Sequence, residues 1–446
     1  MAGTLIRDGV LHSDQVSFSE GVLGIDWTKL GFGLVGVKVG WGVLIGLVFG
    51  VLAYRISLGL MKHTRIFGID LNKETKMKIP EGVGLGCGLA FVCSIFCLAG
   101  LVPIFREVLL VSACTITLNL LLGYVDDTME LGWSCKLVFP LIAMVPLVLA
   151  YNGSTWVQLP FRGSVDLGGW FYGLVLVLAV FFTNAVNILS GVNGVESGQV
   201  LVISGFMVVD RWIFWDGLSV VSLSLSFSLF CCTLGLFWLN AYPARCFVGD
   251  TFCYFAGSSI LCVGLVGGFT KTVFVFFGPQ LLNFGLSLPQ LAGIVACPRH
   301  RMPRAQRIGQ AWLVRASEAP VAAPKRLKLL QVPVLRLAYL VGLVEVEDGL
   351  GQINSTLTSY WNKRSKEELF TGQSQIKSKT DQLGPSLPTS PKPIQPMKIV
   401  NFTLLNLILQ WFGPMSERAL AQSLMLSQGL FCTLVILGKI AITRWC

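Results

Sequence analysis

The sequence predicts an all-α polytopic membrane protein, with about ten transmembrane helices and a cytosolic insert between the ninth and the tenth. Its 446 residues are 53% hydrophobic and only 13% charged, whereas soluble proteins carry about 25% charged residues. The mean hydropathy is +0.69. Apolar windows of about 20 residues, the length that crosses a hydrocarbon layer, recur along the chain. An ordinary soluble protein is therefore excluded.

Ten apolar windows predict the spans, and the fourth and sixth windows are the shortest. The residues before the first window are polar and mixed. We therefore expect no cleavable signal peptide, and the first span would serve as its own signal. In chain order the windows are Val39–Leu60, Val83–Phe105, Val108–Val125, Leu137–Tyr151, Leu167–Asn187, Gly198–Val209, Gly217–Leu239, Phe252–Phe269, Val273–Leu291 and Ala419–Ile442.

The windows divide the chain into four predicted regions. An N-terminal luminal segment covers residues 1–32, and a nine-helix membrane core with cytosolic active-site loops covers 33–297. A cytosolic insert covers 298–396, with a basic start and a proline-rich linker, "GPSLPTSPKPIQP". Within this insert, "QVPVLRLAYLVGLVEVEDG" predicts short strands. A re-entrant or amphipathic segment and the tenth helix make up residues 397–446.

The thirteen cysteines lie mostly inside apolar windows. They form no CxxC pair and no cluster with histidine. We therefore interpret them as small hydrophobic side chains rather than as metal ligands or disulfides.

Basic residues predict the orientation in the membrane. The loops after the first and ninth windows are rich in Lys and Arg, which concentrate on the cytoplasmic side. This bias explains the net charge of +10 without a nucleic-acid partner. Every dense polar motif then falls on the cytosolic face. These motifs are "DLNKETKMKIPEG", "DDTMELGWSCK", "NAVNILSGVNGVESGQ", "ARCFVGDTFCYFAG" and "CPRHRMPR".

Carboxylates and amides on this face suit a hard cation. Asp126 and Asp127 close the third window, although charged groups are costly near hydrocarbon. Asn187 and Asn193 follow the fifth window, and Asp250 opens the eighth. Oxygen ligands of this kind suit Mg²⁺, which takes few protein ligands and completes its shell with substrate phosphates.

Cations and glycines on the same face suit a phosphate substrate. The side chains of Lys136, Arg299, His300 and Arg301 can bind phosphate oxygens. Glycines such as Gly191 allow a ligand to approach the backbone closely. Together with the acids, they favour phosphoryl transfer to or from a lipid, which depends on positioning and charge neutralisation.

Each motif also has a structural interpretation. Paired aspartates and asparagines at helix ends are common caps, and a basic cluster beside a membrane is usually a topology anchor. Their gathering on one face makes these separate interpretations less probable than a shared site.

The five motifs, in this order and at these distances, resemble the eukaryotic, dolichyl-phosphate-dependent branch of the polyprenyl-phosphate N-acetylhexosamine-1-phosphate transferase superfamily. The resemblance runs from Val39 to Arg304 and resumes at Asn401. The segments "NILSGVNGVE" and "FVGDTFCYFAG" carry most of it.

The resemblance implies a ten-helix protein of the endoplasmic reticulum membrane with its active site facing the cytosol. It implies transfer of N-acetylglucosamine 1-phosphate from UDP-N-acetylglucosamine to dolichyl phosphate, as the first step of N-glycan precursor synthesis. The products are dolichyl-diphosphate-N-acetylglucosamine and UMP. Mg²⁺ is the implied cofactor and tunicamycin the implied inhibitor, and some members are homodimers.

The resemblance also implies roles for individual residues. Asn187 and Asp250 would bind Mg²⁺. Asp126 and Asp127 would be the catalytic carboxylates, Asp126 acting on the lipid phosphate that Lys136 holds. We favour direct attack by the lipid phosphate over an aspartyl intermediate.

The implied substrate residues surround the nucleotide sugar. Arg301 would clamp the diphosphate, with Arg299 and His300 near the diphosphate and the sugar. Phe247 would stack on uracil opposite Gly191. Asn193 and Glu81 would hydrogen-bond the uridine.

The chain departs from the family at two places. Glu130 stands where the family commonly has Asn or Asp, and residues Ala305 to Met397 diverge from a compact β-rich insert. Another sugar or another polyprenyl phosphate therefore stays open, as does, from a different class, a membrane transporter. A prenyltransferase would need a second aspartate-rich motif.

Of the sequons at Asn152, Asn354 and Asn401, only Asn152 is expected in the lumen.

Overall fold

The computed structural model describes residues 32–73, 76–129, 131–159, 163–298, 301–319, 331–345 and 398–445. Expectations for the N-terminal luminal segment, the proline-rich linker, Glu130, Arg299, His300 and Asn354 therefore lie outside the described residues. The chain forms two compact units. The described residues of the first lie within Met1–Phe284, Arg307–Leu313 and Ser416–Cys446, and those of the second lie within Gly285–Gln306 and Val314–Met415.

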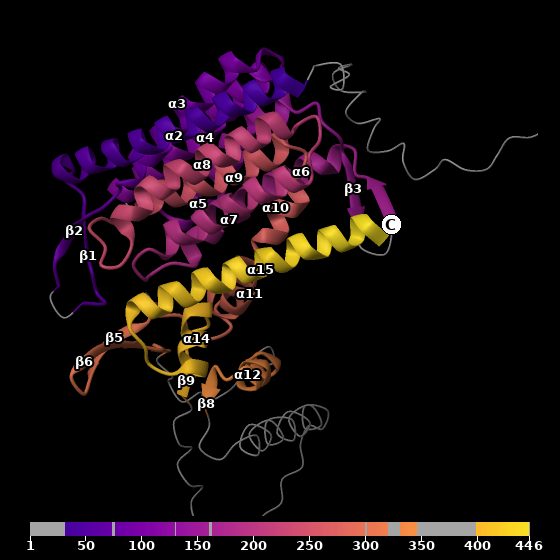
Figure 1. Cartoon of the computed structure of the whole chain (residues 1–446). Helices are drawn as coiled ribbons and strands as arrows, with labels where there is room; N and C mark the ends of the chain where they lie inside the picture. Colours follow the sequence, from indigo (N-terminus) through magenta and orange to yellow (C-terminus); the bar gives the residue numbers. More distant parts are fainter. Residues whose placement is uncertain are drawn as a thin grey trace, which may run out of the picture. The chain divides into compact units, whose positions relative to one another are not determined.

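The first unit is a bundle of apolar helices, whose long members run in roughly one direction in Figure 1. Helix α9 lies within the bundle, and all of its residues from Thr251 to Val266 are buried. It packs mainly against α4 and α6. The helices of this unit are α2 (Phe32–His63), α3 (Gly84–Leu101), α4 (Arg106–Met129), α5 (Trp133–Ala150), α6 (Gly169–Ile188), α7 (Val195–Ile213), α8 (Ser219–Asn240), α9 (Gly249–Val266), α10 (Thr270–Phe276) and α15 (Glu417–Trp445).

Seven of the described helices are long and apolar enough to cross a membrane. The count becomes eight if α10 and α11 (Gly278–Leu291), which bend by 59° at their junction, form one span. All ten predicted windows fall on helices, but two of these helices are not counted as spans. The apolar stretch of α5, Ser134–Ala150, is slightly too short, and α7 is too polar. The polar residues of α7 include Glu196, Asp210 and Arg211. The fold is therefore mostly helical and polytopic.

Close packing of α2 against α8 depends on a row of small residues. A Cβ atom at Gly42, Gly46 or Gly50 would lie within 2.0–2.8 Å of atoms of Ser224, Phe227 or Cys231. This spacing of four residues places all three glycines on one helix face, where small side chains let two membrane helices approach each other.

Two antiparallel hairpins connect helices of the first unit. Strands β1 (Phe67–Ile69) and β2 (Lys78–Pro80) pair between α2 and α3, with Phe67 opposite Pro80. Strands β3 (Trp156–Leu159) and β4 (Gly163–Asp166) pair between α5 and α6. The first hairpin lies beside the segment that leads into α9, because the Phe247 N–H donates to the Pro80 carbonyl.

The second unit contains short strands as well as helices. Strands β7 (Glu318–Ala319), β9 (Lys398–Val400) and β8 (Val344–Glu345) form an antiparallel sheet in that order. Helix α14 spans Leu404–Phe412. A separate two-stranded sheet joins β5 (Arg304–Ile308) to β6 (Ala311–Arg315), and its residues Arg307–Leu313 are counted with the first unit.

The prediction of strands across "QVPVLRLAYLVGLVEVEDG" is wrong for most of that segment. Residues Gln331–Leu340 form helix α12, and only Val344–Glu345 is a strand. The buried residues of α12 include Leu335 and Ala338, which are three positions apart. This is the spacing of one helix face rather than the alternation of a strand.

Candidate active site

Four helix ends bring the predicted catalytic and metal-binding side chains together. Asp126 lies in the last turn of α4, Lys136 in the first turn of α5, Asn187 in the last turn of α6 and Asp250 in the first turn of α9. These residues are up to 124 positions apart in the sequence. Their side chains are nevertheless in contact, as expected for residues predicted to lie on one face of the membrane.

Lys136 bridges two of the acids. Its Nζ atom lies 2.7 Å from Oδ2 of Asp126 and 3.1 Å from Oδ2 of Asp250. The Asp126 side chain is only 1% exposed, whereas Lys136 and Asp250 remain partly accessible. A buried carboxylate of this kind needs a cation, and Lys136 supplies one positive charge to two negative ones. The carboxylates of Asp126 and Asp250 therefore keep one negative charge that Lys136 does not balance, and a second cation would balance it.

The residues around Asp250 fit a magnesium ion. The Nδ2 atom of Asn187 donates a hydrogen bond to Oδ1 of Asp250 at 2.7 Å, so the amide and the carboxylate are already in contact. Within the part of the chain that the structure describes, no three His, Cys, Asp or Glu residues are grouped to hold a metal. The Asp250 carboxylate and the Asn187 amide offer hard oxygen ligands, which Mg²⁺ commonly supplements with substrate phosphate and water.

Asp127 makes different contacts from its neighbour Asp126. Its Oδ1 atom accepts the backbone N–H of Asp250 at 2.7 Å, and its Oδ2 atom accepts the backbone N–H of Thr251 at 3.1 Å and the Thr251 hydroxyl. It thereby satisfies N–H groups that the first turn of α9 leaves without partners. Asp127 thus caps the helix that carries Asp250.

Two glycines make this cap possible. Gly82 and Gly249 adopt φ values of +72° and +76°, a conformation that favours glycine. A Cβ atom at Gly249 would lie 2.2 Å from Oδ2 of Asp127, and one at Gly82 would lie 3.5 Å from the same oxygen. The Asp127 carboxylate therefore occupies space that a larger residue at position 249 would fill.

The predicted uracil-stacking residue, Phe247, is held beside Glu81. The Phe247 N–H donates to the Pro80 carbonyl at 2.8 Å. A Cβ atom at Gly68 would lie 2.7 Å from the Phe247 ring and 2.9 Å from Oε2 of Glu81, so both side chains lie against strand β1. Burial raises the pKa of the Glu81 carboxyl, and the negative charge of Asp127 raises it further.

Asn193 and Gly191 are held by residues from distant parts of the chain. The Asn193 backbone N–H donates to Oε1 of Glu417 at 2.9 Å, and its Nδ2 atom donates to Oδ2 of Asp70 at 3.1 Å. The Gly191 carbonyl accepts Nδ2 of Asn72 at 3.0 Å. The sequence did not single out Asp70, Asn72 or Glu417. Glu417 could not have been found from motif spacing, since it is 224 positions from Asn193.

Arg301 belongs to the second unit. Its backbone carbonyl accepts hydrogen bonds from Nδ2 of Asn406 at 2.8 Å and from the Ser317 hydroxyl at 3.2 Å. Burial lowers the pKa of its guanidinium. The Nη1 atom is buried and has no protein partner among the described residues, so its hydrogen-bonding capacity is unused.

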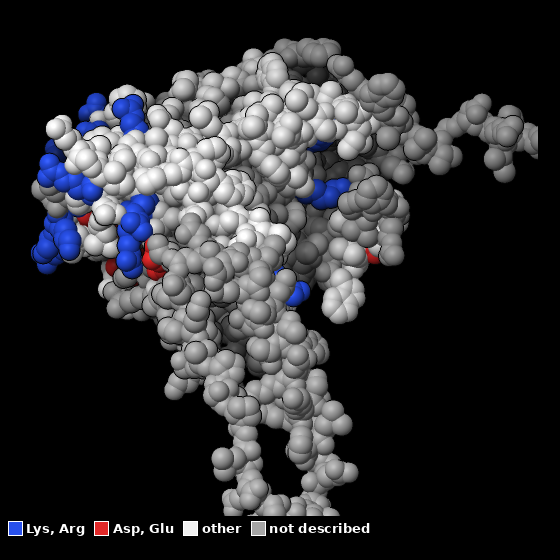
Figure 2. Space-filling view, turned by 90° about the horizontal axis from the view of Figure 1, so that it is seen from below, with Lys and Arg blue, Asp and Glu red and all other residues white. Residues whose placement is uncertain are grey.

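Basic residues mark the end of the first unit that holds the β1–β2 hairpin. Figure 2 shows Lys and Arg gathered at the left of that view, the side on which Figure 1 draws the end of α2 and this hairpin. The exposed basic residues of this segment include Lys62, Arg65, Lys76 and Lys78. Their concentration is typical of a cytoplasmic face.

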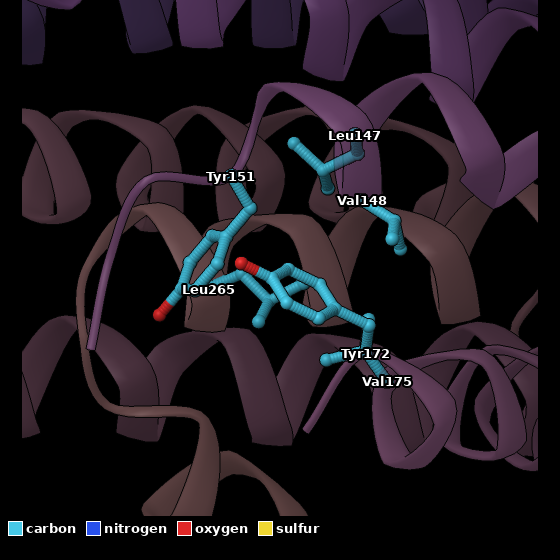
Figure 3. Close-up of a pocket in the computed structure, with 6 residues that line it drawn as sticks. All are labelled: Leu147, Val148, Tyr151, Tyr172, Val175 and Leu265. Carbon is cyan, nitrogen blue, oxygen red and sulfur yellow. The ribbon is translucent and has the colours of Figure 1, made fainter. Parts of the chain in front are cut away.

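A small apolar pocket lies at the opposite helix ends (Figure 3). Its residues come from the end of α5, the first half of α6 and the end of α9, whereas the polar cluster lies at the start of α5, the end of α6 and the start of α9. It contains no carboxylate or cation, so it is separate from the chemical site. The lining residues are Leu147, Val148, Tyr151, Tyr172, Val175 and Leu265.

A family comparison covers the segment that carries this cluster of side chains. Residues 109–268 match the family model described as glycosyl transferase family 4. That segment includes Asp126, Lys136, Asn187 and Asp250.

Three similar proteins are named UDP-N-acetylglucosamine–dolichyl-phosphate N-acetylglucosaminephosphotransferase. The protein from Dictyostelium discoideum is 36% identical over 300 residues, covering 57% of this chain and 73% of the relative. The protein from Saccharomyces cerevisiae is 33% identical over 345 residues, covering 73% and 66%. The protein from Schizosaccharomyces pombe is 35% identical over 314 residues, covering 60% and 70%.

The relatives confirm the resemblance drawn from the five motifs. The similarity extends over most of the length of each of these proteins and is not confined to a single motif. The chain therefore belongs to glycosyl transferase family 4.

Proposed function

We propose that this enzyme transfers N-acetylglucosamine 1-phosphate from UDP-N-acetylglucosamine to dolichyl phosphate, giving dolichyl-diphosphate-N-acetylglucosamine and UMP. The observation that carries the proposal is the contact of Lys136 with both Asp126 and Asp250, with Asn187 beside Asp250. A cation and hard oxygen ligands at one membrane face suit two phosphate substrates. The names of the relatives supply the substrates.

The reaction exchanges one phosphorus–oxygen bond for another. An oxygen of the ionised lipid phosphate attacks the phosphorus attached to the sugar, and the bond from that phosphorus to the UMP oxygen breaks. Lys136 holds the lipid phosphate, and Asp126 orients Lys136. Mg²⁺ held by Asn187 and Asp250 would neutralise charge on the diphosphate and the leaving UMP. Asp250, Asn187 and Lys136 are thus the residues that align the two phosphates.

The contacts of the two adjacent aspartates favour direct attack. Both oxygens of Asp127 are hydrogen-bonded to the start of α9, which makes this carboxylate a poor nucleophile. Asp126 is buried and paired with Lys136. We therefore propose that Asp126 acts at the lipid phosphate by orienting Lys136. Asp127 was expected to be catalytic, and we propose instead that it positions Asp250.

The nucleotide sugar would lie along strand β1 and the loop after α6. Phe247 would stack on uracil opposite Gly191, with Glu81 and Asn193 bonding the uridine. Arg301 would clamp the diphosphate, and Arg299 and His300 would lie near the diphosphate and the sugar. The unpartnered Nη1 atom of Arg301 supports this role.

The proposal places the enzyme in the endoplasmic reticulum membrane with ten spans and a cytosolic active site. α5 and α7 would supply the two spans beyond the eight that length and hydropathy support. The exposed basic residues around the β1–β2 hairpin support a cytosolic orientation of that end.

A direct transfer assay tests the function. Purified protein in detergent is incubated with radiolabelled UDP-N-acetylglucosamine, dolichyl phosphate and Mg²⁺, and label extracted into organic solvent is counted. We expect lipid-soluble label that EDTA, tunicamycin and Asp250→Ala each abolish. Parallel reactions with UDP-N-acetylgalactosamine and undecaprenyl phosphate test the other sugar and the other lipid. Transfer only to one of these alternatives, or no transfer by folded protein, would overturn the proposal.

A further inference from the structure

The hydrogen bonds of Asn193 fix the orientation of its side-chain amide. Its Nδ2 atom donates to Oδ2 of Asp70 at 3.1 Å, and the residue is only 5% exposed. No described residue donates to its Oδ1 atom. The amide therefore uses its donor group on the protein and keeps its acceptor for a ligand.

The chemistry of Asp70 makes this orientation the only satisfactory one. An ionised carboxylate accepts hydrogen bonds but donates none, so the amide oxygen of Asn193 cannot face it. Two further contacts hold the Asp70 carboxylate in place. The Asn72 N–H donates to its Oδ1 atom at 3.1 Å, and Nζ of Lys73 lies 3.6 Å from its Oδ2 atom. Rotating the amide would place two acceptors against each other in a buried site.

The backbone of Asn193 is fixed by the first turn of α15. Oε1 of Glu417 accepts its N–H at 2.9 Å, and Lys73 forms an ion pair with Oε2 of the same carboxylate. Glu417 is 4% exposed. Lys73 thus contacts both Glu417, which holds the backbone of Asn193, and Asp70, which orients its side chain.

Strand β1 relates this network to the predicted base-binding residues. Gly68 contacts Phe247 and Glu81, and Asp70, two residues further along, contacts Asn193. Two residues of extended chain span about 7 Å. This is the scale of a pyrimidine ring with one hydrogen-bonding neighbour, so the spacing along the chain is compatible with a base that stacks on Phe247 and bonds to Asn193.

We propose that Asp70 is a specificity-determining residue, which selects uracil over cytosine by holding the Asn193 amide with its oxygen toward the base. Uracil carries a hydrogen on N3 and can donate to that oxygen. Cytosine has a lone pair on N3 and would place an acceptor against it. The inference rests on the proposed function, because it assumes a uridine nucleotide beside Asn193.

Competition between UMP and CMP in the presence of Mg²⁺ tests this inference. For the full-length protein in detergent we expect UMP to bind at least about 100-fold more tightly than CMP, since a site built around a hydrogen bond rejects a ligand that cannot form it. Asp70→Asn lets the amide of Asn193 rotate, because an amide at position 70 can accept as well as donate. We expect the UMP:CMP ratio to fall to about 10 or below.

A swapped double variant separates this role from a structural one. In Asp70→Asn with Asn193→Asp, the amide at position 70 can donate to one oxygen of the new carboxylate, and the other oxygen still faces the base as an acceptor. We expect the double variant to recover the uracil preference that Asp70→Asn loses. Damage to the fold would not be repaired by exchanging the two groups. If the single variant does not fold, the double variant still tests the proposal by its own ratio.

Two control variants complete the experiment. Asp166→Asn makes the same chemical change at an exposed site in β4 and should leave the ratio unchanged. Glu417→Gln should weaken UMP and CMP alike, because it loosens the backbone of Asn193 without changing the orientation of the amide. An unchanged ratio in Asp70→Asn, or no recovery in the double variant, would overturn the inference. Wild-type protein that does not prefer UMP would instead overturn the uridine site of the proposed function.

Discussion

Asp127 on α4 accepts the backbone N–H of Asp250 on α9 at 2.7 Å. This bond fixes the first turn of α9, and with it the side chain that contacts both Lys136 and Asn187. The ends of α4 and α9 are thus joined by a carboxylate whose two oxygens are both hydrogen-bonded to the start of α9.

Asp127→Asn should impair the metal site rather than the lipid site. The neutral amide places an NH₂ donor or a weaker acceptor against two backbone N–H groups, so the start of α9 shifts and Asp250 loses its position. Removal of a group that orients a ligand commonly costs 10- to 100-fold in metal affinity. We expect about that increase in the Mg²⁺ concentration for half-maximal transfer, with an unchanged KM for dolichyl phosphate. Thr128→Ala, one residue further along, is the control. An unchanged Mg²⁺ requirement in Asp127→Asn would contradict the positioning role.

Lys136→Met should remove transfer almost completely. Asp126 would then be buried without a cation, and the lipid phosphate would lose its counter-charge. Loss of one group that stabilises transition-state charge costs roughly 100- to 1,000-fold in kcat. Lys136→Arg keeps the charge but changes the donor geometry, so it should restore only part of the rate. Single-turnover transfer at saturating substrate measures the effect, and a Met variant that keeps a tenth or more of wild-type kcat would rule out the proposed contact with phosphate.

Nucleotide binding should depend on the protonation of Glu81. Its pKa is raised above the ordinary value of 4.5 by burial and, secondarily, by Asp127. If the ionised carboxylate accepts a hydrogen bond from the uridine, affinity for UMP should fall as the pH decreases through this raised pKa. Titration calorimetry at several pH values measures the change. Glu81→Gln should flatten the profile, and an unchanged profile in that variant would assign the pH dependence to another group.

The raised pKa of Glu81 should also affect stability. UMP affinity is expected to fall as the pH decreases, whereas stability is expected to fall as the pH increases. The folded state of Glu81 binds a proton more tightly than the unfolded state does, so the free energy of unfolding should decrease as the pH rises from 4.5 to the folded-state pKa. Thermal unfolding of nucleotide-free protein should show this slope, and Glu81→Gln should reduce it. A slope that is the same in both proteins would mean that other groups dominate.

A buried charge cluster at the other end of α15 should affect stability but not nucleotide binding. Asp210 is fully buried between Arg211, at 2.8 Å, and Lys439, at 2.7 Å. Asp210→Asn leaves two cations without their shared acid, which typically costs about 3–5 kcal/mol. Lys439→Met removes one cation and leaves the Asp210–Arg211 pair, so it should cost less. Melting curves in detergent measure both, with KM for UDP-N-acetylglucosamine expected to stay unchanged. A changed KM would show that this end of α15 is coupled to the substrate site.

Much of the fold and of the site follows from the sequence. Each predicted window lies on a helix, because a chain crossing hydrocarbon must satisfy its backbone hydrogen bonds internally. The contacts among Asp126, Lys136, Asn187 and Asp250 follow from their places at the ends of these helices, on the side where loops rich in Lys and Arg remain. Hydrophobicity and charge are properties of individual residues, so they can be seen without knowledge of the packing.

Only the tertiary structure showed that Asp127 caps α9 and found the partners of Asn193. The two aspartates are the same residue type in adjacent positions, but successive residues on a helix point about 100° apart. One carboxylate therefore contacts Lys136, and the other contacts the start of α9. Glu417 reaches Asn193 across 224 positions because α15 packs against α7. Such contacts depend on which helix faces pack together, and the local pattern of a sequence does not specify that.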